Sequence, residues 1–594
     1  MFQKIRIILS GLLAIFCTLM IYFNNYMGES ILVSSSSMFS MLVFILLMIL
    51  FYSMLIYKKI REYIISFIFS LILAVSTCVG DKFIINKNVD FNNVRFFTKD
   101  LYLMIIVLTL IFTAIFVLLL NNLKKINSYF NKILNIKISS KLSTYIKKYF
   151  IIILALFFLF CWIPAYLAVF PGNYTYDGPI QISQVFISGR LDQHHPIIHT
   201  ALLSGFIYLG KLLFGSYDVG LGMYCWFQAI IVAISFAYLC KFMIKNRVPH
   251  ILVIFSILFL AFNPIIQLFV FITTKDVIFG SLLILCIIQT VEIVKNPEKF
   301  YSSNKLMIKY ILSIILMCLF RKQGIYVFVI IVPILAFSIR KYLFKTLIIS
   351  LISILLVEVF LGPIATLMNA KKASSVEMLS VPIQQIARVV NKNPDSLTED
   401  EKAEILSYIP EDALQQYIPE ISDPVKDKTR IEEIEKDKMK FIKLWLKIGM
   451  KNKGLYIQSF LYGSVGYFYP SVNTSHNWSK VMGAYTSGKV VIVNKPILKG
   501  YHDYLYNVGT NLFSDIPIAS ALVCSALPFW IMIIILSVII KQKDYKMIIP
   551  MLFIAIFWLS LLLGPVYCVR YVYPLLICIP LMISMPFCRY KSIE

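Results

Sequence analysis

Residues 101–120 have the sequence LYLMIIVLTLIFTAIFVLLL, which contains no charged side chain. An apolar run of this length crosses the roughly 30 Å hydrocarbon core of a bilayer as one helix. Similar blocks recur along the chain, so that 59% of its 594 residues are hydrophobic and only 15% are charged. Soluble domains hold about 45–50% apolar and about 25% charged residues. The sequence therefore predicts an all-α polytopic membrane protein and excludes a cytosolic enzyme, a secreted domain or a disordered scaffold.

Fourteen segments are predicted to span the membrane on these grounds. The lysines and arginines that raise the formal net charge to +25 cluster in the short loops after the second, fourth, sixth, tenth and twelfth segments. Cytoplasmic loops carry such an excess of basic residues, and all five loops are cytoplasmic if both termini are. The positions of the basic residues thus indicate how the chain is oriented in a lipid bilayer. The positive net charge needs no further explanation, and no nucleic-acid partner is expected. The predicted spans are 6–23, 38–57, 63–80, 101–120, 149–170, 218–240, 250–272, 277–294, 307–320, 325–339, 345–366, 516–540, 547–565 and 572–588.

Residues 197–214 are apolar enough to be a further span, but counting them as one would invert every later loop. The segment also carries His199, Tyr208 and Lys211. We therefore expect an interfacial helix that lies on the outer leaflet. The loop that contains it then faces outward, as do the long polar region after the eleventh span and several tight hairpins.

Four regions follow from this layout: an N-terminal four-span region with a basic cytoplasmic loop, a transmembrane core with a first outer loop, a mainly helical outer domain, and a C-terminal three-span region. The outer domain holds 17 of the 31 acidic residues and none of the eleven cysteines. No disulfide is therefore expected inside it. The bounds are, in that order, 1–148, 149–366 with its outer loop at 171–217, 367–515 and 516–594.

The first outer loop contains a carboxylate beside two amides. Pro179 suits the first turn of a helix, and Asp177, Gln181 and Gln184 then share one face of it. A carboxylate at the outer end of a span can accept a proton from a hydroxyl group, while the amides orient that hydroxyl. The simpler interpretation is a helix cap, since aspartate is favoured at that position. The local sequence leaves both interpretations open.

Three of the six histidines, His194, His195 and His199, lie close together further along the same loop. A zinc site is conceivable because imidazole is a common zinc ligand. No cysteine is nearby, however, and the spacing matches no closed structural zinc site. A polar turn that leads into the interfacial helix, or hydrogen bonding to a substrate, are the alternatives.

Three outer hairpins carry cations. Lys275 and Asp276 open a span, and an ionisable pair there is costly unless it is paired or used. Thr274 or Asp276 can also act merely as a cap of that helix. Arg321 breaks the positive-inside pattern, which favours a phosphate pocket or an anchor to lipid headgroups. Arg570 precedes Tyr571 at the outer interface, where a snorkelling arginine in an aromatic belt or a phosphate or sugar site would fit.

This arrangement resembles the GT-C superfamily of membrane glycosyltransferases, which use polyprenyl-phosphate-linked sugars. The likeness covers about residues 149–588 and looks closest to a bacterial branch of that fold, with four spans added at the N-terminus. Two departures stand out: Gly178 replaces the second acid that often follows the family's aspartate, and the loops hold fewer acids than those of the metal-using members. The motifs, in order, are Asp177 after a span, His195-Pro196 before a juxtamembrane helix, Lys275-Asp276 at the next outer hairpin, a late outer domain, and Arg570-Tyr571 before the last span.

The resemblance implies roles for these residues. Asp177 would be the general base that takes the proton of an acceptor hydroxyl as it attacks the anomeric carbon, with inversion. The leaving polyprenyl phosphate would need cations, supplied by Lys275, Arg321 and Arg570. No cofactor is implied, and a divalent metal is not favoured. The implied substrate-binding residues are Gln181, Gln184, His194, His195, Asp276 and Tyr571.

The implied enzyme would act on the outer face of the cell membrane, on an acceptor glycan, lipid or protein of the cell envelope. A flippase or transporter for lipid-linked sugars is an alternative, although it would need polar groups near mid-bilayer. A polysaccharide polymerase or ligase would share the polyprenyl carrier but would use a lipid diphosphate. A binding scaffold would tolerate Asp177→Asn.

Overall fold

The computed structural model describes residues 2–23, 37–85, 98–133, 140–175, 177–470, 484–487, 490–508, 516 and 519–588. The regular structure of these residues is helical except for two short antiparallel strands, β1 (Ala484–Ser487) and β2 (Val490–Val493). Within the described part of the chain, ten helices are long and apolar enough to cross a membrane. The protein is therefore an all-α polytopic membrane protein, as its composition predicts.

Nine of these ten helices coincide with predicted spans, and the tenth is α7 (Ile197–Phe214). The other predicted spans are shorter helices. Two of them, 250–272 and 516–540, are each divided between two helices. α9 (His250–Phe262) ends before Asn263, whose side chain caps the separate α10 (Pro264–Phe269), because the residue before a proline disfavours helical geometry. Likewise α25 (Ala519–Val523) is separate from α26 (Leu527–Gln542).

The chain divides into two compact units, and the first comprises Met1–Asn135 together with Trp530–Tyr545. In this unit α1 packs against α2 and α3 against α4. Lys541 on α26 donates to the carbonyl oxygen of Leu120 at 2.8 Å, and Trp530 contacts Phe112 edge-on. Most of α26 thus belongs with the N-terminal helices rather than with the last two spans. The helices are α1 (Phe2–Phe23), α2 (Ser37–Leu55), α3 (Ile60–Ile85) and α4 (Lys99–Ile133).

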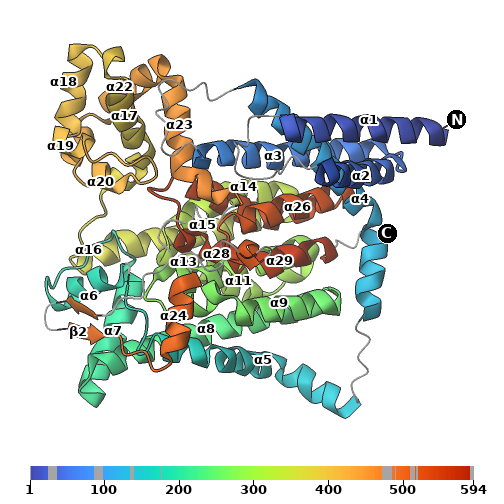
Figure 1. The fold of residues 1–594 in the computed structure, drawn as a ribbon. Coiled ribbons are helices and arrows are strands. Elements are labelled where there is room, and N and C mark those ends of the chain that lie inside the picture. The colour runs from blue at the N-terminus through green and yellow to red at the C-terminus, as the bar shows by residue number, and fades with distance from the viewer. Residues whose placement is uncertain are drawn as a thin grey trace. The chain divides into compact units, whose positions relative to one another are not determined.

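The second unit comprises Ile136–Phe529 and Lys546–Glu594. Its centre is α11 (Lys275–Lys295), which packs against α8, α13, α27 and α28 (Figure 1). In the most apolar 18-residue stretch of α11, 89% of the residues are buried inside the protein. Such burial is expected for a helix that is apolar on every side. The other helices are α5 (Ser140–Ala168), α6 (Gly178–Phe186), α8 (Tyr217–Lys245), α12 (Pro297–Tyr301), α13 (Asn304–Phe320), α14 (Gln323–Ser338), α15 (Leu343–Val359), α16 (Ala365–Leu367), α24 (Lys499–Val508), α27 (Ile548–Leu561), α28 (Val569–Leu576) and α29 (Ile579–Ser584).

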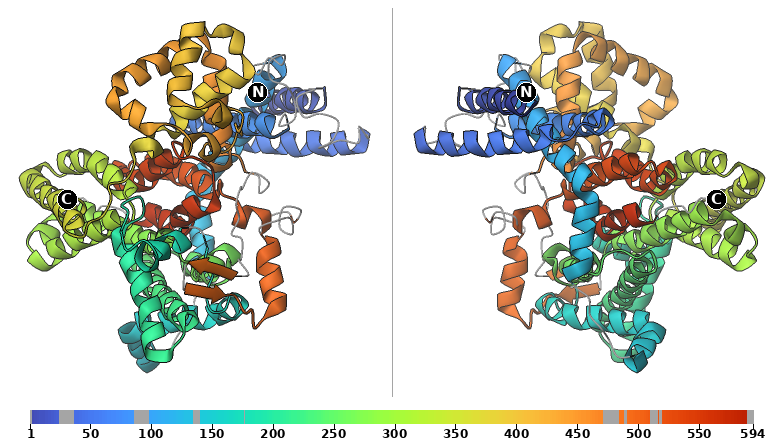
Figure 2. Two further views of the ribbon diagram at one scale, coloured as in Figure 1. Left: turned by 90° about the vertical axis from the view of Figure 1, so that its left-hand side faces the viewer. Right: turned by 90° about the vertical axis from the view of Figure 1, so that its right-hand side faces the viewer.

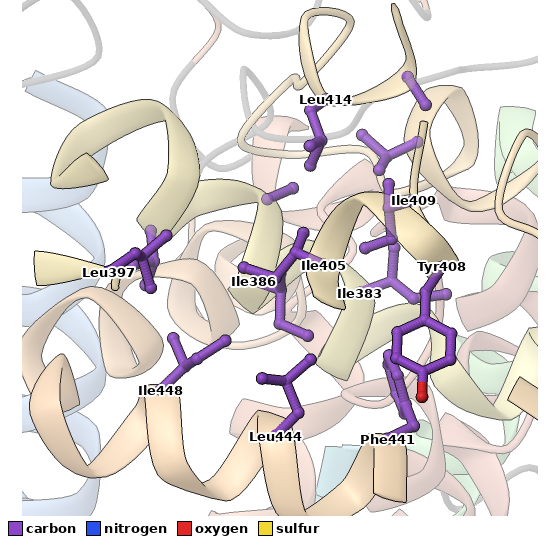
Figure 3. Close-up of a cluster of buried hydrophobic side chains, with 14 of the residues drawn as sticks. Ile383, Ile386, Leu397, Ile405, Tyr408, Ile409, Leu414, Phe441, Leu444 and Ile448 are labelled. Carbon is purple, nitrogen blue, oxygen red and sulfur yellow. The ribbon is translucent and has the colours of Figure 1, made fainter. Parts of the chain in front are cut away.

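Seven helices of the predicted outer domain, α17 to α23, form a compact lobe, coloured yellow to orange in Figure 1 and Figure 2. The helix α24, from the same predicted domain, packs instead against α5 and α10. Apolar side chains of α17, including Ile383 and Ile386, meet Leu444 and Ile448 of α22 in the hydrophobic core of the lobe (Figure 3). This packing provides a rigid core without any disulfide. The helices are α17 (Ser380–Lys392), α18 (Glu399–Tyr408), α19 (Glu411–Leu414), α20 (Asp423–Lys426), α21 (Ile431–Lys436), α22 (Lys438–Lys451) and α23 (Lys453–Ser464).

Candidate functional site

The loop after α5 pairs with the segment that leads into α11. The Asn173 N–H donates to the Phe271 carbonyl oxygen at 2.9 Å, and the Thr273 N–H donates back to the Asn173 carbonyl oxygen at 3.1 Å. The Thr175 N–H then bonds the Thr273 hydroxyl at 3.2 Å. Because the two segments run in parallel, the start of α6 and the start of α11 lie side by side.

This pairing brings Asp177 and Lys275 into contact, and Arg570 at the start of α28 completes the group. Lys275 Nζ donates to Asp177 Oδ2 at 2.9 Å. The Arg570 guanidinium binds the same carboxylate in a fork, with Nη1 3.1 Å from Oδ1 and Nη2 3.2 Å from Oδ2. Forked pairs of this kind are stronger and more specific in geometry than single contacts. Asp177 is thus held by two cations from two different helices.

Asp177 precedes α6, but its side chain makes no capping hydrogen bond there. The structure therefore does not support the interpretation of Asp177 as a simple helix cap. Burial by itself would raise the pKa of Asp177, but Arg570 and Lys275 outweigh it and hold that pKa well below its ordinary value of 3.8. The carboxylate is consequently ionised at neutral pH.

A second carboxylate, Asp276, lies fully buried next to the first. It pairs with Arg321, which follows α13, and its Oδ2 lies 3.2 Å from Arg570 Nε. The Thr274 hydroxyl donates to the same oxygen at 2.8 Å, and Arg321 also bonds the side chain of Gln323. Arg570 therefore bridges both acids, which joins the three predicted cations into one network.

Aromatic rings enclose this network. The Arg321 guanidinium carbon lies 5.2 Å from the centre of the Tyr571 ring, and that of Arg570 lies 4.9 Å from the same ring. Phe279 and Phe557 place their rings 5.7 and 5.3 Å from Arg321. Contacts at this range are attractive between cations and rings. Tyr571 consequently lies between two of the predicted phosphate-binding residues.

His195 lies at the edge of the same network, whereas His194 and His199 have other surroundings. His195 is buried, and its Nδ1 is 3.6 Å from Asp177 Oδ2. The His194 ring packs against His195. Burial lowers the pKa of His194, and the neighbouring His195 and Lys275 lower it further, so this ring is neutral at pH 7.

The two glutamines predicted to bind substrate have partners within the protein. Gln181 donates to Thr200 at 3.1 Å and contacts His199 at 2.9 Å, so its amide is used on both sides. Gln184 accepts from the Asp192 N–H at 3.1 Å. In this structure Gln181 ties α6 to α7, and Gln184 ties α6 to the loop between them. The part of both residues in substrate binding stays a prediction.

Gly178 is required by the close approach of α6 to the loop before α11. A Cβ atom at this position would lie 2.4 Å from the Thr273 hydroxyl oxygen and 2.9 Å from the Thr273 Cβ. No side chain fits there, which gives a physical reason why this chain lacks the second acid that the resemblance would lead one to expect after Asp177.

The substitution Gly178→Ala is therefore expected to lower the free energy of unfolding by about 1–3 kcal/mol, the usual cost of overpacking a tight contact. The measurement is denaturant unfolding of the purified protein in detergent. Gly205→Ala on α7 is the matched control, because a Cβ atom there meets nothing within 4 Å. Equal stability of the two variants would contradict the close contact.

The structure thus brings together Asp177, Asp276, Lys275, Arg321 and Arg570, with His195 and Tyr571 beside them. The sequence does not single out Gln323, Phe279 and Phe557, because neither residue type nor spacing separates them from ordinary helix positions. Thr274 was recognisable only as a candidate cap.

The network contains two carboxylates and three cations, so it carries one excess positive charge. Its cations can therefore bind an anion, while one of its two carboxylates can still contact a hydroxyl group of a bound molecule. A metal centre would need a different set of ligands. Among the residues that the structure describes, no group of three or more His, Cys, Asp or Glu side chains is placed to hold a metal ion.

The fold and this network define a polytopic membrane protein with a charged polar site at the ends of its central helices. Residues 186–593 match a family described as a family of unknown function, DUF6020, and the chain belongs to that family. The match includes Lys275, Arg321 and Arg570 and begins after Asp177. No curated protein and no solved structure matches the chain.

Proposed function

We propose that this protein is a membrane glycosyltransferase that moves a sugar from a polyprenyl-phosphate donor to an acceptor hydroxyl. The observation that carries the proposal is the placement of Asp177 between Lys275 and Arg570. A carboxylate that can accept a proton and cations that can hold a phosphate are the two requirements of this reaction. Here they lie within hydrogen-bonding distance of each other.

In the proposed reaction the acceptor oxygen forms a bond to the anomeric carbon while the bond from that carbon to the phosphate oxygen breaks. The proton of the hydroxyl passes to Asp177. Both electrons of the broken bond leave with the polyprenyl phosphate. The donor is a phosphodiester with one negative charge, and the leaving group is a monoester that carries one charge more. Attack opposite the leaving group inverts the anomeric configuration.

The excess positive charge of the network suits this change. Preorganised cations accelerate a reaction when they bind the transition state more tightly than the ground state. Negative charge grows on the phosphate as the bond breaks, so Lys275, Arg321 and Arg570 would bind it progressively better. An already anionic leaving group needs such cations more than it needs a proton donor.

A carboxylate bound to two cations is a weak base. Binding of the donor would make Asp177 a stronger base. A phosphate that reaches Lys275 and Arg570 would compete with Asp177 for the same donors. Loss of either partner would raise the pKa of Asp177, because these cations are what hold it down. The base would thus become effective only once the donor is in place, which would limit wasteful hydrolysis.

The proposed topology has fourteen spans, both termini in the cytoplasm and the site outside, and it requires that α7 does not cross the membrane. If α7 crossed the membrane, Asp177 and Lys275 would lie on opposite sides of it. The two side chains are 2.9 Å apart, which favours an interfacial α7. The hairpins that carry Arg321 and Arg570 reach the same point, as expected if all these helix ends are extracytoplasmic.

The proposal can be tested with purified protein in nanodiscs, given radiolabelled polyprenyl-phosphate hexoses and a crude envelope acceptor fraction, with and without EDTA. We expect label to move to an acceptor in both conditions. A lipid-diphosphate oligosaccharide donor used in place of the monophosphate sugar would favour a polymerase or ligase. Movement of labelled lipid between leaflets without any transfer would reject the enzyme in favour of a flippase.

The pH dependence of transfer distinguishes Asp177 from a histidine base. A carboxylate with a depressed pKa stays ionised until the pH falls through that depressed value. The kcat/KM of wild type, which reports the free enzyme, should therefore stay level from about pH 7.5 to about pH 5. A histidine base would make it fall within that range. Such a fall would move the role of base away from Asp177.

A further inference from the structure

The helix α15 is exposed along most of its length. It belongs to the candidate span Arg340–Leu367, but only 22% of the residues in the most apolar 18-residue stretch of that span are buried inside the protein. Side chains such as Leu351, Leu355 and Val359 are between 45% and 56% exposed, so they face lipid in a bilayer. Glu358 is exposed among them and is the only acidic residue of α15.

Glu358 lies well inside this span. Lys345, at the basic end of the helix, is 13 residues away, or about 20 Å at the rise of an α-helix, and Leu367 is nine residues, or about 13 Å, in the other direction. In the predicted spans every other Asp, Glu, Lys or Arg lies within two residues of a span end. A lone carboxylate at such a depth is costly, and residues of this kind usually have a partner or a function.

The chain itself supplies no partner for this carboxylate in the part that the structure describes, where no hydrogen bond or ion pair to Glu358 is found. Glu358 borders a crevice between α13, α14 and α15, together with side chains such as Ile325 and Phe328 of α14. Neither of these two side chains can donate a hydrogen bond. The lipid tails around α15 cannot do so either, which leaves the carboxylate to be satisfied from outside this chain.

The helix is also shaped for close approach on the same side. Gly362 follows Glu358 by four residues and therefore lies near it on one helix face. A Cβ atom at Gly362 would meet nothing within 4 Å. Residues 360–364 form a π-helical turn that contains Pro363, and such turns are frequent at functional positions. Small residues let two membrane helices approach closely, and polar side chains then hydrogen-bond between them.

The charge of Glu358 specifies what occupies this face. The strongest complement of a carboxylate inside a bilayer is the ammonium group of lysine or the guanidinium group of arginine. A second copy of this chain has no such group to offer at this depth, because the lysines and arginines of its predicted spans lie close to the span ends. The complement therefore belongs to a different membrane protein.

We propose that the face of α15 around Glu358 and Gly362 binds a transmembrane helix of another membrane protein, and that this helix carries a lysine or an arginine opposite Glu358. Gly362 lets the helix approach, and the ion pair fixes its depth and rotation. None of these residues belongs to the charged network, so the proposal does not depend on the glycosyltransferase activity. The protein would then be one subunit of a membrane complex.

The first test uses a synthetic membrane helix as the probe. A leucine–alanine helix of about 23 residues, with one lysine at the depth of Glu358, is compared with the same helix carrying leucine at that position. Each is reconstituted with the full chain in phosphatidylcholine vesicles, and association is measured by energy transfer between two dyes. Wild type should bind the lysine helix about 3- to 30-fold more tightly than the leucine helix.

Three variants locate the interaction. Glu358→Leu should lose the preference for lysine, and Gly362→Leu, which keeps the carboxylate but blocks the approach, should bind the lysine helix more weakly than wild type. Glu432→Gln changes an exposed acid of the helical lobe and should behave as wild type. Glu358→Leu should not lower the melting temperature, because it removes a charge that faces lipid. Equal binding of both peptides by wild type, or an unchanged preference in Glu358→Leu or Gly362→Leu, would overturn the proposal.

A photo-crosslinking residue in place of Leu355 then identifies the neighbour in the membrane of cells that produce the protein. Capture of a different membrane protein that has a basic residue inside a span, and loss of that capture in Glu358→Leu, would support the proposal. Capture of a second copy of this chain, or of lipid alone, would overturn it.

Discussion

Asp177→Asn is expected to reduce sugar transfer by about 10²–10⁴-fold, the usual contribution of a positioned general base. Asparagine has almost the same shape, and its amide oxygen can still accept from Lys275. It cannot take a proton from the acceptor hydroxyl, and it cannot form the charged fork with Arg570. The measurement is label transfer from the polyprenyl-phosphate donor under single-turnover conditions, with wild type and variant side by side.

Asp412→Asn is the matched control for this substitution. Asp412 is an exposed residue of the helical lobe formed by α17 to α23 and pairs with Lys428 at 2.7 Å, so the same chemical change is made at a surface ion pair. Transfer by this control should equal that of wild type. Transfer by Asp177→Asn at the rate of wild type would remove Asp177 from the mechanism.

Asp276→Asn is expected to have the largest effect on stability. Asp276 is fully buried and pairs with Arg321, whose own side chain is only 6% exposed. Removal of one partner leaves a buried charge without compensation, which costs about 3–5 kcal/mol. The free energy of unfolding, measured by SDS titration of the protein in mixed micelles, should fall by that amount.

A double substitution separates this electrostatic effect from simple loss of packing. Asp276→Asn combined with Arg321→Met removes both charges and keeps an apolar side chain among Phe279, Phe557 and Tyr571. The double variant should recover much of the lost stability, because a buried ion pair is often replaceable by apolar residues. A double variant less stable than Asp276→Asn alone would contradict the isolated-charge explanation. Glu399→Gln, at an exposed ion pair on α18, should leave stability unchanged.

Much of the fold was predictable because hydropathy is a local property. A bilayer requires about 20 apolar residues per helix and favours basic residues in cytoplasmic loops. The break at Asn263-Pro264 was also open to prediction, since proline ends helices at the residue before it. The break between α25 and α26 carries a similar signal, since Pro528 is the second residue of α26. The packing of α26 with the N-terminal helices, by contrast, depends on contacts between segments far apart in the chain.

The residue types of the candidate site were predictable from the sequence, but their arrangement in space was not. Asp177, Lys275, Arg321 and Arg570 stand out because ionisable side chains at span ends are costly unless they are paired or used. This argument does not predict which of these side chains pair with each other. The sequence places Lys275 and Asp276 next to each other as an ionisable pair, whereas in the structure Lys275 bonds Asp177 and Asp276 bonds Arg321.

By itself, then, the sequence determined that this chain is a polytopic helical membrane protein with ionisable residues at one set of helix ends. Each of these properties depends on transfer between water and lipid over about 20 residues. Only the tertiary structure decided which of these residues meet. Asp177 is 98 residues from Lys275 and 393 from Arg570. Their contact depends on how α6, α11 and α28 pack, and on the space that Gly178 leaves open, neither of which local composition encodes.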